Sequence, residues 1–138
     1  HPIVTSREKV SARVREITAG EGVPVVYDSI GKDTFMDSLA CLRPLGMMVS
    51  FGNASGPVPA FEPALLAKMG SLFLTRPTLF HYTARRADLL AMADELFAMV
   101  AAGQVRISVN QRYPLKDAAL AHAALEARRT TGSTVLIP

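Results

Sequence analysis

Cysteine is nearly absent from the sequence, and so are long apolar runs. Cys41 is the single cysteine among 138 residues, which excludes an internal disulfide and a cysteine-rich zinc site. Its place inside a helical pattern predicts a buried, apolar side chain. No apolar run is long enough to span a bilayer, and no signal-peptide pattern opens the chain. We therefore expect a cytoplasmic location and no membrane partner.

Basic clusters are also missing. The net charge is +3, charged residues make up 20% of the chain, and the lysines and arginines are spread thinly. A nucleic-acid-binding surface usually shows a basic block interleaved with aromatic residues, so we expect no nucleic-acid partner. Hydrophobic residues make up 49% of the chain, which is enough for a packed core in one domain of ordinary size.

The residue types used for metal binding and nucleophilic catalysis are scattered. The histidines His1, His81 and His122 show no metal-ligand spacing. Ser50 precedes Phe51 outside any G-x-S-x-G motif, so it is not a nucleophile elbow. His122 lies among alanines in a predicted helix, where a packing or surface role is favoured over catalysis. We nominate no catalytic residue and no metal ligand.

Short strands alternate with helices along the chain. A capping box of Thr5 and Glu8 predicts the start of the first helix, and Gly103 is placed to end the longest one. The β-branched run from Val23 to Asp28 predicts a strand buried on both faces. Helices are predicted over residues 5–19, 33–42, 63–69, 88–102 and 114–127, and strands over residues 23–28, 47–51, 72–75, 105–109 and 134–137.

This alternation is typical of an α/β fold, in which a parallel sheet carries helices on its faces. The pyrophosphate-binding half of a doubly wound nucleotide-binding domain has a G-x-G-x-x-G motif after its first strand. No such motif stands between a strand and a helix here. The sequence therefore predicts the second half of a Rossmann-type doubly wound parallel sheet. The opening at His1, which is not an initiator residue, fits the expectation of a fragment.

Two loops after predicted strands offer groups for a ligand. Ligands of open α/β sheets bind beyond the carboxyl ends of the strands, where residues 28–31 and 51–56 are expected to lie. Their glycines, hydroxyls and backbone donors suit a flat cofactor ring or a carboxamide, and the alternative is a plain turn that needs glycine for positive φ. Asp28 can orient a base, bind a ribose or cap a helix. Arg128 and Arg129 end a predicted helix, where they complement its dipole or bind an anion.

Several segments resemble the medium-chain dehydrogenase/reductase superfamily. The general resemblance rests on VVYDSIG at residues 25–31 and CLRPLGMMVSFGNASG at residues 41–56. GSLFLTRP at residues 70–77 and YPLKDA at residues 113–118 are similar to its zinc-free quinone oxidoreductase branch, the zeta-crystallin type. The resemblance covers nearly the whole chain and is weakest before Lys9.

The resemblance implies a domain arrangement and a reaction. Members have a GroES-like catalytic domain and a nucleotide-binding domain, after which the chain returns to the catalytic domain. By that likeness, residues 1–103 are the later part of the nucleotide-binding domain, and residues 104–138 are a helix and strand that return to a catalytic domain missing here. Members transfer hydride from NADPH to a quinone without a metal. We expect part of an NADPH:quinone oxidoreductase that is inactive by itself.

Other functions stay open at this point. Related branches of the superfamily reduce enones and other activated alkenes, and lens crystallins of this type illustrate a non-catalytic structural or interaction role. Half of a methyltransferase is a further α/β reading, which the segment from Tyr113 to Glu126 disfavours. An upstream AxxGGVG-like loop and a GroES-like domain in the same gene would favour the enzyme.

The resemblance also implies which residues bind the cofactor. Thr5 stands where close relatives place a tyrosine near the adenosine phosphate, so the choice between NADPH and NADH stays open. The positions that match cofactor-binding residues are Ser29 and Ile30 beside the ribose, Phe51, Gly52 and Asn53 beside the nicotinamide and its carboxamide, and Arg128 near the C-terminus.

Two further expectations concern association and affinity. The strand from Leu72 to Thr75 matches one that pairs across a two-fold axis in the family, and an apolar edge strand favours such pairing. We therefore expect a homodimer through this strand. Backbone donors at a helix N-terminus supply the main anion site of such domains. Because that segment is missing, we expect the chain by itself to bind NADPH weakly or not at all.

Overall fold

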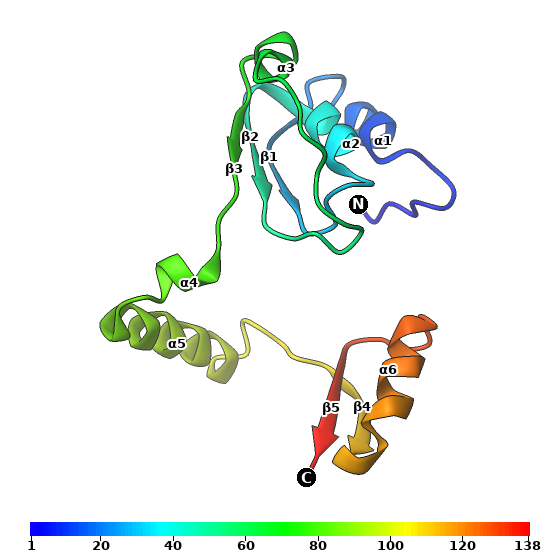
Figure 1. The fold of residues 1–138 in the computed structure, drawn as a ribbon, viewed down its shortest axis with the longest axis vertical. Coiled ribbons are helices and arrows are strands. Elements are labelled where there is room, and N and C mark those ends of the chain that lie inside the picture. The colour runs from blue at the N-terminus through cyan, green and yellow to red at the C-terminus, as the bar shows by residue number, and fades with distance from the viewer. The chain divides into compact units, whose positions relative to one another are not determined.

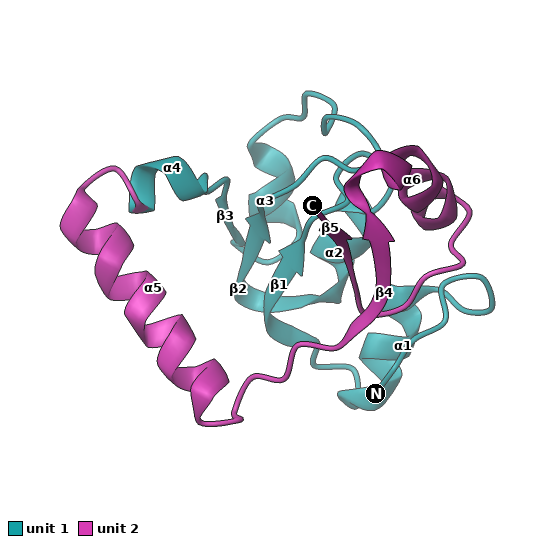
Figure 2. Cartoon of the chain, turned by 90° about the horizontal axis from the view of Figure 1, so that it is seen from below, with its two compact units in different colours: residues 1–82 teal, residues 83–138 magenta.

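The computed structural model describes residues 1–138. The chain divides into two compact units, residues 1–82 and residues 83–138 (Figure 2). Each unit contains a small sheet of its own. These compact units are not the functional domains expected from the sequence. The expected domain boundary between residues 103 and 104 stays a prediction.

Three parallel strands form the sheet of the first unit. β1 (Val23–Asp28), β2 (Leu42–Ser50) and β3 (Phe73–Thr75) lie side by side in that order (Figure 1). Asp28 and Ser50 are partners in the register of β1 and β2. The carboxyl ends of these two strands therefore meet at one edge of the sheet, and the predicted α/β fold with a parallel sheet is confirmed.

Helices join the strands of the first unit. α1 and α2 pack against each other, and α2 also packs against β1 and β2. The two helices lie on the same side of the sheet (Figure 1). The short helix that follows β3 was not predicted. The helices are α1 (Val10–Ile17), α2 (Phe35–Cys41), α3 (Ala64–Lys68) and α4 (Leu79–Tyr82).

The core of the first unit lies between α2 and the sheet. Leu39 of α2 and Leu42 and Met48 of β2 are fully buried, and burial of each such side chain contributes about 1.5–3 kcal/mol. Cys41 is also buried, and its thiol donates a hydrogen bond to the carbonyl oxygen of Asp37 at 3.2 Å. The buried role predicted for Cys41 is confirmed.

The other face of this sheet is exposed, so the prediction that β1 is buried on both faces was wrong. Side chains alternate between the two faces along a strand. Met48 is buried on the face against α2, whereas Val25, Tyr27 and Phe73 have exposed fractions of 38%, 73% and 56%. Within this unit α2 covers only the first of these faces, which a run of β-branched residues does not reveal.

α1 begins later than predicted, and the prediction of a capping box formed by Thr5 and Glu8 was wrong. Glu8 instead accepts a long hydrogen bond, 3.4 Å, from the backbone N–H of Val4. The first turn of α1 is capped from another helix, because Asp37 of α2 accepts hydrogen bonds from the backbone N–H of Ser11 (3.1 Å) and from its hydroxyl. A carboxylate at this end also complements the helix dipole.

Arg15 of α1 ties three segments of the first unit together. Its guanidinium donates to the carbonyl oxygens of Ala40 (3.0 and 3.2 Å) and Leu42 (2.7 Å), where α2 gives way to β2. It also donates to the carbonyl oxygens of Gly20 and Glu21, both at 2.9 Å, in the turn after α1. A planar fork of donors is suited to several carbonyls at once.

The second unit begins with its longest helix, α5 (Arg86–Ala101). The helix ends at Gly103 as predicted: Gly103 has a φ of +71° and donates to the carbonyl oxygen of Val100 at 3.0 Å. A left-handed residue just after a helix commonly closes it in this way. Neither α5 nor any other helix of residues 1–138 is long and apolar enough to cross a membrane.

A parallel strand pair and a helix complete the second unit. β4 (Val109–Pro114) pairs with β5 (Ser133–Ile137). Between them lie a 3-10 turn (Leu115–Asp117) and α6 (Ala118–Glu126), which packs beside β4 (Figure 1). The continuous helix predicted over residues 114–127 is therefore shorter, and a tighter turn precedes it.

The strand predicted over residues 105–109 was wrong, because β4 begins where that prediction ended. The backbone N–H of Val105 donates to the carbonyl oxygen of Met99 at 3.3 Å, so Val105 belongs to the turn that closes α5. Val109 instead pairs with Ser133 of β5. The alternating pattern of residues 105–109 resembles a strand, but the available pairing partner places the strand further along the chain.

Candidate functional site

The site is built on the turn that follows β1. The carboxylate of Asp28 has an exposed fraction of only 4%. One of its oxygens accepts hydrogen bonds from the backbone N–H groups of Ile30 (2.8 Å) and Gly31 (3.0 Å). The other accepts from the hydroxyls of Thr34 and Ser38, both at 2.7 Å. These bonds hold the turn between β1 and α2 in one conformation.

The Asp28 carboxylate serves structure rather than ligand binding. Burial disfavours the ionised carboxylate, but the hydrogen bonds from Ser38, Gly31, Thr34 and Ile30 outweigh burial and lower the pKa of Asp28 below its ordinary value. A carboxylate offers about four lone-pair positions, and Asp28 uses them within the chain. Asp28 accepts from no backbone N–H of α2, so it does not cap that helix. Its carboxylate instead holds the turn that precedes α2.

The loop after β2 is hydrogen-bonded to the turn after β1. The backbone N–H of Ala54 donates to the carbonyl oxygen of Ser29 at 3.2 Å, and that of Ser55 donates to Ile30 at 2.8 Å. The Ser55 hydroxyl donates to the same Ile30 oxygen, also at 2.8 Å. The two loops therefore continue the pairing of β1 and β2 beyond the strand ends and form one rigid edge.

Two glycines are required where these loops approach each other. A β-carbon built on Gly52 would lie 2.3 Å from the carbonyl oxygen of Ser29, far inside van der Waals contact. Gly31 has a φ of +91°, and a β-carbon there would lie 2.7 Å from the carbonyl oxygen of Gly56. Gly52 thus serves close loop contact, whereas Gly31 serves both contact and positive φ.

The same edge presents polar groups without partners. The hydroxyl of Ser29, the side-chain amide of Asn53 and the backbone N–H of Gly52 make no hydrogen bond within the chain. Ser29 and Asn53 are exposed, and Gly52 is half-buried. These groups can donate to or accept from a ribose or a carboxamide. The structure therefore brings together Ser29, Ile30, Phe51, Gly52 and Asn53, which the sequence predicted as cofactor-binding residues.

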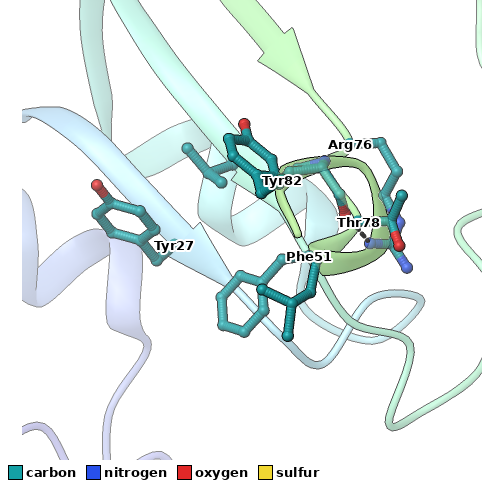
Figure 3. Close-up of a pocket in the computed structure, with 8 residues that line it drawn as sticks. Tyr27, Phe51, Arg76, Thr78 and Tyr82 are labelled. Atoms are coloured by element: carbon teal, nitrogen blue, oxygen red, sulfur yellow. Dashed lines mark hydrogen bonds between the residues drawn. The ribbon is translucent and has the colours of Figure 1, made fainter. Parts of the chain in front are cut away.

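An aromatic hollow lies beside this edge. It has a volume of about 840 Å³ and is lined by Tyr27, Val49, Phe51, residues 76–79 and Tyr82. Figure 3 shows these lining side chains, with Tyr27 set apart from Tyr82, Thr78 and Arg76. Apolar hollows of about this size with a few polar groups are typical binding sites for small molecules.

Arg76 is the charged residue of this aromatic hollow. One guanidinium nitrogen donates to the carbonyl oxygen of Pro77 at 3.2 Å, and Arg76 is otherwise exposed. Sequence reasoning nominated neither Arg76 nor the tyrosines Tyr27 and Tyr82. For Tyr82 the available signal was the pair of aromatic residues in Leu79–Tyr82, a few residues after a predicted strand.

Arg128 lies in the second unit, at the end of α6. It has a φ of +54°, a conformation in which side chains other than glycine are strained. The N–H of Arg128 donates to Leu125 (3.0 Å) and that of Arg129 donates to Ala124 (3.1 Å), which is the hydrogen-bond pattern that commonly closes a helix. The role of Arg128 in cofactor binding stays a prediction.

Other reactive side chains do not form a site. Burial raises the pKa of the Cys41 thiol, which leaves it in the unreactive, protonated form. His122 is exposed on α6, in agreement with its predicted surface or packing role. No three His, Cys, Asp or Glu side chains of residues 1–138 come together as a metal site.

Parallel strands with loops at their carboxyl ends are typical of open α/β proteins, which bind ligands at this edge. A family model described as zinc-binding dehydrogenase matches residues 1–136. The chain belongs to this zinc-binding dehydrogenase family.

Individual relatives support the assignment. A quinone oxidoreductase of Pseudomonas aeruginosa is 56% identical over 133 residues, covering 96% of this chain and 41% of that protein. A 2-haloacrylate reductase of a Burkholderia species is 48% identical and covers 100% of this chain and 42% of that protein. The crystal structure of Escherichia coli quinone oxidoreductase complexed with NADPH superposes with a TM-score of 0.91 at 47% identity, covering 99% of this chain and 42% of that chain. The chain thus spans about two fifths of the length of these relatives.

The zinc in the family's description does not fit the residues present. Tetrahedral zinc sites need several cysteine, histidine or carboxylate ligands in one place. The one thiol is buried and bonded to the carbonyl oxygen of Asp37, and no ligand cluster surrounds it. Residues 1–138 therefore offer no zinc site.

Proposed function

We propose that the chain supplies the nicotinamide side of an NADPH-dependent quinone oxidoreductase. The observation that carries this proposal is the rigid edge formed by the two loops. The edge has free donors at Ser29, Gly52 and Asn53, and its Phe51 lines the aromatic hollow. A relative named quinone oxidoreductase and a related structure complexed with NADPH support the substrate and the cofactor. The pyrophosphate site and the catalytic domain are then supplied by sequence outside these 138 residues.

The proposed roles follow from the free groups. The Gly52 amide and the Asn53 side chain bind the carboxamide, and Phe51 packs against the nicotinamide ring, as the resemblance implies. Ser29 and Ile30 lie along the ribose. NADPH, when bound, supplies the hydride. The chain holds the nicotinamide ring in one orientation and keeps water from the aromatic hollow. No residue of the chain needs to act as an acid or a base.

The remaining parts of the proposal concern the whole enzyme. Arg128 contacts an anionic part of the cofactor, and residues 104–138 return to the catalytic domain. The quinone enters the aromatic hollow, whose aromatic walls suit a flat apolar ring. The enzyme is a cytoplasmic homodimer that uses no metal and binds neither nucleic acid nor membrane.

An activated alkene is the second candidate substrate. A relative that is 48% identical to this chain is named 2-haloacrylate reductase, and its name gives an activated alkene as the substrate. Both reactions use a hydride acceptor next to the nicotinamide, so the two proposals share every cofactor residue named here. They differ in the acceptor, which steady-state rates with a benzoquinone and with 2-chloroacrylate distinguish.

A chimera tests the proposal. This chain replaces the matching segment of the Pseudomonas aeruginosa quinone oxidoreductase, and NADPH oxidation is followed with 1,4-benzoquinone. We expect an active enzyme in which Asn53→Ala weakens NADPH binding about tenfold, because one hydrogen-bonding side chain is lost. Gln104→Ala, at an exposed residue of the second unit that carries no proposed cofactor group, is the matched control and leaves the affinity unchanged.

Two results would contradict the proposal. One is a folded chimera that fails to oxidise NADPH with either acceptor. The other is an NADPH affinity that is the same with and without Asn53→Ala. In titration calorimetry the 138-residue chain by itself is expected to bind NADPH weakly or not at all, and micromolar affinity would show that the pyrophosphate site is not needed.

A further inference from the structure

The first unit contains a second cavity, on the α2 side of the sheet. Its volume is about 470 Å³, and it lies between Phe35 of α2, Leu74 of β3 and residues 57–61. We name it the phenylalanine cavity. Arg76 is the one residue that lines both this cavity and the aromatic hollow. Its guanidinium can therefore contact a ligand in either of them.

Two aromatic rings give the phenylalanine cavity its apolar wall. The ring centroids of Phe35 and Phe61 are 5.2 Å apart, and the planes are tilted by 43°. Phe35 belongs to the buried core, whereas Phe61 has an exposed fraction of 36%. This geometry is a favourable one for aromatic contact, and a third ring can pack against the pair without disturbing the core.

A buried serine whose hydroxyl has no partner within the chain lines the same cavity. Ser11, Asp28 and Ser50 are the buried polar residues of the chain. Ser11 bonds to Asp37, and Asp28 accepts four hydrogen bonds. Ser50 has an exposed fraction of only 4%, lines the cavity and makes no side-chain hydrogen bond. No buried side-chain oxygen or nitrogen of residues 1–138 lacks a partner, so the unpaired Ser50 hydroxyl is an accessible part of this buried residue. It can donate a hydrogen bond to a ligand in the cavity.

The other polar groups of the cavity are donors as well. Asn53 contributes an amide, and Arg76 contributes a guanidinium of which one nitrogen is bonded to Pro77. No aspartate or glutamate lines the cavity. Hydroxyl, amide and guanidinium donors around one space, with a positive charge and no negative one, are complementary to a carboxylate.

We propose that the phenylalanine cavity binds a small aromatic carboxylate. The ring packs against Phe35 and Phe61, and the carboxylate accepts hydrogen bonds from the Ser50 hydroxyl and the Arg76 guanidinium. This inference rests on the cavity alone and holds whether or not the chain takes part in quinone reduction.

The test uses 4-fluorobenzoate as the probe and the 138-residue chain as the protein. Fluorine NMR of the probe is expected to show saturable binding in the millimolar range or tighter. Ser50→Ala and Arg76→Gln are each expected to weaken binding about tenfold, because each removes a hydrogen bond to a charged group. The neutral analogue 4-fluorobenzamide binds more weakly than the carboxylate and is insensitive to Arg76→Gln.

Three controls make the result decisive. Ser6→Ala and Arg43→Gln change an exposed serine and an exposed arginine that do not line the cavity, and both retain binding. Ala60→Trp fills the cavity from its exposed rim and abolishes binding while the fold, checked by circular dichroism, is kept. Absence of saturable binding, or equal affinity in the wild type, Ser50→Ala and Ala60→Trp, would overturn the proposal.

Discussion

Gly52 passes so close to Ser29 that a β-carbon on Gly52 would lie 2.3 Å from the Ser29 carbonyl oxygen. The obstacle is backbone, held by a hydrogen bond from Ala54, and it cannot rotate away as a side chain can. The contact fixes the distance between the two loops that carry the proposed cofactor groups. Gly52 therefore matters for the shape of the site even if a ligand never touches it.

Gly52→Ala is expected to lower the free energy of unfolding by about 2–4 kcal/mol, because the two loops must separate. Urea denaturation followed by circular dichroism measures this. Gly20→Ala is the matched control: its φ is +89°, but nothing lies within 4 Å of the added β-carbon. It should cost only about 1 kcal/mol, the price of the left-handed backbone. Equal effects of the two substitutions would show that loop contact is unimportant.

Arg15 should be among the most sensitive positions of the first unit. Its guanidinium bonds to the carbonyl oxygens of Ala40, Leu42, Gly20 and Glu21, and a lysine cannot satisfy them together. Arg15→Lys is expected to lower the free energy of unfolding by about 2–4 kcal/mol. Thermal unfolding tests this against Arg13→Lys, where an exposed ion pair with Glu16 should contribute little. A small effect of Arg15→Lys would mean that water replaces these bonds.

The features that were predicted correctly are those that short-range patterns determine. β1 occupies Val23–Asp28 as predicted, because β-branched residues favour strands. The loops after β1 and β2 were expected at the carboxyl edge because parallel strands end together. That placement brought Ser29 and Asn53 to one edge without any knowledge of side-chain contacts.

The features that were missed depend on partners far along the chain. Asp37 caps α1 from another helix, so no local capping signal marks the helix start. The exposed side chain of Tyr27 depends on which face α2 covers. The start of β4 depends on β5 as its pairing partner. Each of these is decided by tertiary packing, which local patterns do not encode.

Asp28 is expected to make stability depend on pH. Its pKa in the folded chain lies below the ordinary value, so the unfolded chain binds the proton more readily. The stabilisation is complete above the ordinary carboxyl pKa of about 4 and is lost as the pH falls through the folded value. The urea concentration at the unfolding midpoint should decrease as the pH is lowered from neutral to acid values. The decrease should be smaller in Asp28→Asn.

Ser38→Ala separates this effect from general acid destabilisation. It removes one hydrogen bond to the Asp28 carboxylate and should raise the pKa of Asp28 toward its ordinary value. The pH dependence of the urea midpoint should then be intermediate between those of the wild type and Asp28→Asn. Identical profiles for all three proteins would show that Asp28 does not supply the pH dependence.

The homodimer prediction rests on β3 at the edge of its sheet. β3 pairs only with β2, and Phe73 on it has an exposed fraction of 56%. Light scattering of the chain at high micromolar concentration is expected to give a dimeric mass. Phe73→Lys should give a monomer, because lysine on an edge strand opposes pairing. Phe80→Lys, at an exposed position on α4, should stay dimeric, and a monomeric wild type would refute the prediction.

Arg128 links backbone strain to the proposed cofactor role. Its φ of +54° at the end of α6 is a conformation that glycine adopts at lower cost, so an arginine there destabilises the fold relative to glycine. Arg128→Gly is expected to raise the free energy of unfolding of the isolated chain by about 0.5–1 kcal/mol. In the chimera the same substitution should weaken NADPH binding about tenfold, because a charged hydrogen bond is lost. Arg129→Gly, at a neighbouring residue without positive φ, should give neither the gain in stability nor the loss in affinity. Stabilisation by Arg128→Gly without any loss of NADPH affinity would leave the arginine as a helix-end residue and remove it from the site.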